Sequence, residues 1–268
     1  QREGNNQKLN GKARLGASEA GITLNTPLFK GKNERSETSL MLSIRRSYLQ
    51  FVFEIVGLPI RPDYWDFQWN INHKIDDHNS LTFIGLGSVD DFSVAPPENF
   101  DEEQQATIEQ VPIIQQRTMT YGISWNRKYK SGNGRVRTTL STNNLQNIFS
   151  RFSDNINKSG VLFENDAKEQ ETKLRMHFIE YKSRLKFSYG FNLQYSYYKN
   201  RTLGILEEFN YFTSIDFLKY GFYGNASSSL LRNKLSFSFG FRSDADTFTQ
   251  GSSISDNFSP RISFSYKI

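Results

Sequence analysis

The sequence contains no cysteine among its 268 residues. This absence excludes a disulfide framework, a thiolate nucleophile and any zinc or iron–sulfur site with cysteine ligands. The sequence also has no run of about 18 or more consecutive apolar residues, which is the length that a membrane-spanning helix requires. A membrane could therefore be crossed only by strands, because closed strand pairing is the other way to satisfy backbone hydrogen bonds in hydrocarbon.

The sequence also has few histidines, and its opening stretch lacks the features of an export signal. The three histidines, His73, His78 and His177, show no metal-ligand spacing, so we predict no metal site and no cofactor. A hydrolase would need a histidine base beside a serine nucleophile, and we predict no enzymatic activity and no catalytic residues. The opening stretch QREGNNQKLNGKARLG lacks the apolar core and the cleavage site of a signal peptide. We therefore expect an exported gene product to begin before Gln1.

The composition combines a low hydrophobic fraction, 37%, with a high aromatic fraction of 15% that includes 23 Phe and 13 Tyr. Disordered chains are depleted in aromatic residues, so disorder does not explain the low hydrophobicity. A transmembrane barrel explains both values, because one face of each strand contacts lipid, the other faces a wet lumen, and aromatic girdles lie at both interfaces. The net charge of +5 comes from scattered basic residues, and we predict no nucleic-acid partner.

Alternation of apolar and polar residues, the signature of a strand, runs along most of the chain. It is clearest in residues 65–75 and in RLKFSYGFNLQYSYY, which is longer than a typical globular strand. A tilted membrane strand needs roughly 9 to 11 residues to cross the bilayer. The pattern predicts about eleven strands, at residues 17–28, 38–47, 65–75, 81–90, 118–129, 135–146, 172–181, 185–197, 219–230, 235–242 and 261–268.

The predicted connections alternate in length. Short polar turns, at KGKNERS, DDHNS, KSGNG, KS and LRNK, are separated by much longer segments. Outer-membrane barrels have short periplasmic turns and long extracellular loops, whereas a soluble β-sandwich has no reason to sort its loops by end. An odd strand number would place the N-terminus outside and the C-terminus in the periplasm. Because single-chain bacterial barrels have even strand numbers, we expect that this chain does not close alone.

Several stretches, taken in order, resemble the barrel of the TonB-dependent receptors. They are GITLNTPLFKGK, LSIRRSYL, LPIRPDYWDFQWNINHKIDDHNSLTFIGLGSVDDF, LRNKLSFSFGFRSDADTF and NFSPRISFSYKI. The resemblance implies an all-β fold, a transmembrane antiparallel β-barrel, with residues 1–268 forming a partial outer-membrane barrel domain, the first half of a 22-strand barrel. The family's plug domain, energy-coupling box and closing C-terminal strand have no counterpart in these residues.

What the resemblance implies for function is import of a scarce nutrient, such as a metal chelate, a glycan or a peptide, across the bacterial outer membrane. The implied partners are outer-membrane lipid, the remainder of the barrel with its plug, and the TonB complex, and a surface lipoprotein or other complex subunits could join them. The alternatives are a structural or secretion-associated barrel without active uptake and a soluble β-protein.

Two stretches supply candidate ligand contacts from long extracellular loops. The first, YLQFVFEIVGLPIRPDYW, is the most apolar connection, and Pro59 and Pro62 argue against a strand running through it. Packing on neighbouring loops is the alternative that we favour for it. The second is the acidic loop 90–116, in which Glu98, Asp101, Glu102 and Glu103 match no EF-hand spacing, so a solvated loop is favoured over a calcium site. The candidates are Tyr48, Phe51, Arg61, Tyr64, Asp90, Asp91 and Phe92.

Four arginines, Arg45, Arg46, Arg242 and Arg261, are expected near strand ends or on lumen faces. Lumen arginines attract anionic substrates or pair with carboxylates of a plug. A role as interfacial or wall charges is the simpler interpretation.

Overall fold

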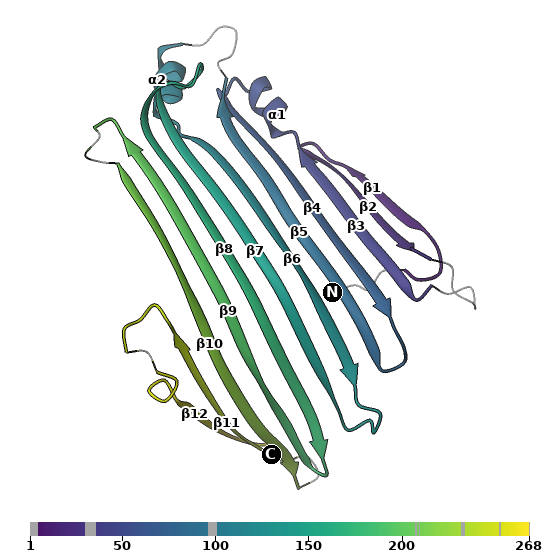
Figure 1. The fold of residues 1–268 in the computed structure, drawn as a ribbon. Helices are drawn as coiled ribbons and strands as arrows, with labels where there is room; N and C mark the ends of the chain where they lie inside the picture. The colour runs from purple at the N-terminus through teal and green to yellow at the C-terminus, as the bar shows by residue number, and fades with distance from the viewer. Residues whose placement is uncertain are drawn as a thin grey trace.

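The computed structural model describes residues 5–29, 36–95, 101–206, 208, 210–231, 234–251 and 253–267. Twelve strands form one antiparallel sheet in which every strand pairs with its neighbours in sequence. The sheet is open, with β1 and β12 at opposite edges (Figure 1). The predicted all-β class and antiparallel meander are confirmed. The strands are β1 (Asn10–Leu15), β2 (Glu19–Pro27), β3 (Thr38–Ser47), β4 (Ile60–Lys74), β5 (Asn79–Val94), β6 (Ile113–Lys128), β7 (Gly134–Asp154), β8 (Ser159–Lys182), β9 (Leu185–Gly204), β10 (Tyr211–Leu230), β11 (Leu235–Asp246) and β12 (Ser259–Tyr266).

The two ends of the sheet carry different connections. The loop end holds two short helices, α1 (Leu49–Ile55) between β3 and β4 and α2 (Glu102–Gln110) between β5 and β6 (Figure 1). The opposite turn end holds tight connections, including residues 75–78, 129–133 and 183–184. The predicted sorting of connections is wrong in one respect. Residues 147–171 and 198–218 were expected to be long loops, but β7 continues to Asp154 and β8 begins at Ser159, while β9 continues to Gly204 and β10 begins at Tyr211.

The strand count also differs from the expected odd number. Residues 10–15 form β1, which carries only small or isolated apolar side chains and is fully exposed, so its alternation is weak. With twelve strands, β1 starts and β12 finishes at the same end of the sheet, the turn end. The expectation that the two ends of the chain lie on opposite sides is therefore wrong. Parts of two predicted short turns, residues 30–35 and 232–233, lie outside the described residues.

One face of the sheet, called here the apolar face, bears a belt of large hydrophobic side chains. Ladder partners share a face, so the register defines this belt across the sheet. One of its rows runs through directly paired residues of β4 to β10. Many of these side chains are exposed, Leu140 to 46% and Phe239 on β11 to 49%. Nothing in the described chain covers them. The row is Ile71, Phe83, Ile123, Leu140, Leu174, Leu193 and Tyr220.

The other face, the polar face, carries serine, threonine, asparagine and charged side chains at the alternate positions. A sheet with one apolar and one polar face is typical of a transmembrane barrel wall. Towards the loop end both faces of the longest strands become polar. On β8 the consecutive residues Lys168, Glu169, Gln170 and Glu171 place charged or amide groups on both sides. The belt therefore occupies the turn-end part of β7 to β10, and their loop-end parts extend beyond it.

Glycines on the apolar face make room for aromatic rings of a neighbouring strand. A Cβ atom on Gly85 would lie 2.0 Å from Cζ2 of Trp69, and one on Gly87 would lie 2.6 Å from Cζ of Phe67. Both rings belong to β4 and stack with an interplanar angle of 2°. Glycine at these two positions of β5 lets the rings lie flat across the adjacent strand. Neither helix in the described residues is long and apolar enough to cross a membrane.

Candidate functional site

The sequence-predicted ligand residues lie at the loop end of β3, β4 and β5, mostly within strands instead of loops. Tyr48 precedes α1, and its hydroxyl donates hydrogen bonds to the backbone oxygens of Gly16 and Glu19, so it ties α1 to the β1–β2 turn. Phe51 lies in α1 and is 57% exposed. Arg61 donates hydrogen bonds to the backbone oxygens of Leu58 and Ile60, which holds it against its own segment.

The expectation that Pro62 interrupts any strand is wrong, because β4 begins at Ile60 and runs through it. β3 pairs with β4 only as far as Trp65, so Pro62 has a strand neighbour on one side, the edge position that proline tolerates. The β4–β5 register pairs Tyr64 with Asp90 and Pro62 with Phe92. Tyr64, Asp90 and Phe92 thus share the polar face, while Arg61 and Asp91 belong to the apolar face.

The acidic stretch after β5 has a local structural role. Asp101 is the N-cap of α2, where its carboxylate accepts a hydrogen bond from the backbone N–H of Gln104 at 2.9 Å and completes a capping box. Glu102 and Glu103 occupy the first turn, where negative charge stabilises a helix N-terminus. Glu98 lies outside the described residues. Within the described residues no three His, Cys, Asp or Glu side chains converge on a metal site.

The four arginines of the sequence analysis have different environments. Arg45 lies on the polar face and pairs with Asp66 at 2.6 Å and Glu19 at 3.1 Å. Arg46 lies on the apolar face near the end of β3, 4.9 Å from the ring centroid of Trp65. Arg242 and Arg261 lie on the polar face of β11 and β12.

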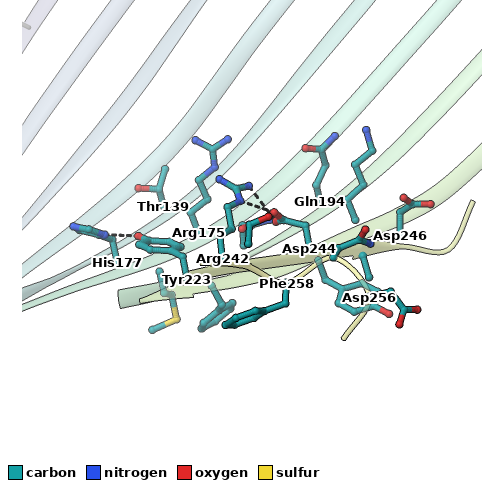
Figure 2. Close-up of a pocket in the computed structure, with 18 of the residues that line it drawn as sticks. Thr139, Arg175, His177, Gln194, Tyr223, Arg242, Asp244, Asp246, Asp256 and Phe258 are labelled. Atoms are coloured by element: carbon teal, nitrogen blue, oxygen red, sulfur yellow. Dashed lines mark hydrogen bonds and ion pairs between the residues drawn. The ribbon is translucent and has the colours of Figure 1, made fainter. Parts of the chain in front are cut away.

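A hollow of about 1120 Å³ opens on the polar face between β7 and the start of β12. Its lining comes from β7 to β11, the β11–β12 connection and the first residue of β12. Figure 2 shows several of these side chains, among them Thr139, Arg175, His177 and Tyr223. Sequence reasoning did not single out this site. Its members are far apart in the chain and come together only through the register of the sheet.

His177 and Tyr223 form the central pair of this hollow. The His177 Nδ1 atom and the Tyr223 hydroxyl are hydrogen-bonded, and the two rings stack with centroids 5.9 Å apart. They reach each other across β9, where Gly190 is the ladder partner of both residues. A Cβ atom on Gly190 would lie 2.8 Å from the Tyr223 hydroxyl oxygen and 2.1 Å from the Met176 backbone oxygen. Glycine at this position therefore permits the pair.

Arg242 and Asp244 form the ion pair at the β11 side of the hollow, with a second contact of 3.1 Å between Nη2 and Oδ1. On the β7–β8 side, the exposed Arg137 and Arg175 make no ion pair with any described residue. Arg137 donates to the neutral Asn126 side chain. The β7–β8 side of the hollow thus presents guanidinium groups beside neutral hydrogen-bonding groups, an arrangement suited to binding an anion, whereas the opposite side also carries the carboxylates of Asp244, Asp246 and Asp256.

No protein-family model and no curated protein sequence matches this chain. Its fold is similar to that of the alcaligin outer-membrane receptor FauA from Bordetella pertussis, with a TM-score of 0.67 and 10% identity over 100% of this chain and 42% of that one. The siderophore receptor PirA from Acinetobacter baumannii gives the same four values. The copper transporter OprC gives a TM-score of 0.62 and 11% identity over 98% of this chain and 42% of the other.

The chain therefore spans less than half the length of the solved structures that it matches. These structures are transport receptors of the outer membrane. The predicted resemblance holds at the level of fold, and the chain has the fold of part of a TonB-dependent receptor barrel.

Proposed function

We propose that this chain is part of the barrel wall of a TonB-dependent receptor that imports a scarce nutrient across the bacterial outer membrane. The observation that supports this most directly is the pairing of an uncovered apolar belt with a polar, charged opposite face on a sheet of receptor-barrel topology. An exposed apolar surface of this extent requires a non-aqueous neighbour, and lipid supplies it. That residues 1–268 form one segment of a larger barrel domain belongs to the same proposal.

The nutrient belongs to the classes expected from the resemblance, a metal chelate, a glycan or a peptide. Of the similar structures, PirA is named as a siderophore receptor and OprC as a copper transporter, which fits a metal chelate. Ligand contacts come from the loop end, where Tyr64, Asp90 and Phe92 share the polar face. A plug, the TonB complex and a surface lipoprotein are the proposed partners, and no catalytic step is assigned to the chain.

Deletion of the gene that encodes this chain tests the proposal. We expect the protein in the outer-membrane fraction, and we expect the deletion strain to lose growth on one scarce nutrient while growing normally when that nutrient is abundant. Growth should return with the native gene, and not in a host that lacks TonB. A protein that remains folded and monomeric in buffer without detergent would contradict the membrane location. Unchanged growth on every limiting nutrient would instead favour a structural or secretion barrel.

A further inference from the structure

Charge is distributed unevenly over the polar face. On the β3–β4 side, Arg45 is compensated by Asp66 and Glu19. On the turn-end parts of β6 to β9 the polar face carries five basic residues and no carboxylate between them, and all five are exposed. We call this group the basic wall. Its members are Lys128, Arg135, Arg137, Arg175 and Lys186.

The register places like charges beside one another in the basic wall. Lys128 is the direct ladder partner of Arg135. Arg137 pairs with His177, and Arg175 pairs with Thr139, so the two arginines are diagonal neighbours on β7 and β8. Like charges directly opposite each other on a sheet destabilise it. Within the described residues, none of the five forms an ion pair that would offset this repulsion.

The basic wall continues directly into the hollow around His177 and Tyr223, which Arg137 and Arg175 also line. Guanidinium groups present several N–H donors in a planar fork that matches carboxylate and phosphate oxygens. Asn192 adds a neutral amide to the same lining, and the carboxylates of Asp244, Asp246 and Asp256 lie on its opposite side, away from the basic wall. A bound anion would therefore both receive hydrogen bonds and relieve the repulsion among the cations.

We propose that the basic wall binds a dissolved solute bearing several carboxylate or phosphate groups, and that it gives the imported nutrient a requirement for negative charge. This inference rests on the proposed function, since it takes the polar face to line the lumen of an importing barrel. One charge would engage a single guanidinium, whereas a polyanion spans several of the adjacent cations. A neutral solute lacks the charge attraction to this surface, and a cationic solute is repelled by it.

Calorimetric titration of the purified whole receptor in neutral detergent tests the proposal. The probes are citrate and pyrophosphate, with glucose as the neutral control and spermidine as the cationic one. Both anions should bind, more weakly at high salt because added ions screen the attraction. The double variant Arg137→Gln/Arg175→Gln should bind them at least about tenfold more weakly, since it loses two positive charges and their charge-assisted hydrogen bonds. The matched control is Arg117→Gln, an exposed arginine on the apolar face of β6.

The proposal is overturned if the native receptor binds neither anion, or if the folded double variant binds them as the native receptor does. An acidic segment of the receptor's own polypeptide, lying on the basic wall, would produce the first of these results. Correct folding of each variant is verified by its heat-dependent migration in gels. The binding measurement uses purified protein, so a failure to bind either anion argues only against the basic wall as an anion site. Failure of the proposed function would instead appear as normal growth of the deletion strain.

Discussion

Single glycines decide where aromatic side chains can lie on this sheet. Replacing Gly85 with alanine would place a Cβ atom 2.0 Å from the Trp69 ring, so the ring must leave its position flat against β5. We expect the variant to lose about 1–3 kcal/mol of stability, the usual cost of overpacking. The midpoint of thermal unfolding of the purified protein in detergent measures this loss.

Gly11 offers a matched control for that substitution. It lies on the same apolar face, and a Cβ atom there would meet Leu24 Cδ2 at 3.4 Å, within ordinary contact. Gly11→Ala should therefore leave the midpoint unchanged. An equal loss in both variants would show that alanine in these strands, and not the collision with Trp69, is responsible.

Asp154 closes the β7–β8 connection through its carboxylate. It accepts hydrogen bonds from the backbone N–H groups of Asn157 at 2.9 Å and Ile156 at 3.0 Å. The backbone N–H of Asn157, followed by its side-chain amide, lowers the pKa of Asp154 below its ordinary value of 3.8. Because the folded pKa is lowered, this contribution is complete above the ordinary value and is lost as pH falls through the lowered one.

The resulting prediction concerns hydrogen exchange in the segment 150–162. Asp154→Ala should accelerate exchange at neutral pH, because the turn loses its acceptor. Asp154→Asn keeps an oxygen acceptor and should retain most of the protection. Mass spectrometry of peptides from the receptor in detergent measures both. Equal acceleration in the two variants would mean that the negative charge, and not the hydrogen bonds, holds the turn.

At the scale of elements, α2 depends on its N-terminal cap. The Asp101 carboxylate accepts a hydrogen bond from the Gln104 backbone N–H, and the Gln104 side-chain oxygen accepts one from the Asp101 backbone N–H. The Gln104 side-chain N–H also donates to the Gly57 backbone oxygen at 2.7 Å. Gln104 therefore completes the cap of α2 and links α2 to the segment after α1. We expect Asp101→Ala to destabilise α2 by about 1 kcal/mol, as loss of an N-cap usually does.

Hydrogen exchange of residues 101–111 measures the effect on α2. Exchange should rise in Asp101→Ala and stay near the native rate in Asp101→Ser, because serine is also a good N-cap. The centre of β5 serves as an internal reference and should be unaffected. If α2 exchanges as fast in the native receptor as in the alanine variant, the capping box contributes nothing measurable.

At the scale of the whole molecule, the apolar belt determines whether the folded sheet is more stable in water or in lipid. Leu140 lies in the belt and pairs with Ile123 and Leu174, while the next residue, Ser141, points to the polar face opposite Gly122. An arginine on the lipid face near the bilayer midplane costs about 2–4 kcal/mol, and much less on a lumen face. Leu140→Arg should therefore reduce the amount of assembled receptor in the outer membrane, and Ser141→Arg should not.

Heat-modifiable receptor in outer-membrane fractions measures assembly of both variants. Equal assembly of Leu140→Arg and Ser141→Arg would contradict the assignment of the two faces. The pair is informative because the substitutions are adjacent in sequence and alter opposite faces of the sheet.

The sequence by itself determined the strand centres and the two faces of the sheet. Where one face is apolar, as in residues 65–75 and 185–197, alternation identifies the strand and its apolar face directly. Alternation did not predict strands where both faces of the sheet carry polar side chains. The loop-end part of β8 around Lys168 to Glu171 has no apolar face, so its alternation disappears although the ladder continues. β1 was missed for a related reason, because Gly11 and Ala13 supply little apolar contrast.

Only the tertiary structure decided which residues meet. His177 and Tyr223 are brought together by the register of β8, β9 and β10 and by the absence of a side chain at Gly190. A shift by one residue in either ladder would move one ring to the other face. The basic wall likewise exists because the register makes Lys128 the ladder partner of Arg135 and places Arg175 diagonally beside Arg137. Alternation specifies the face of each side chain, but pairing between strands specifies its neighbours.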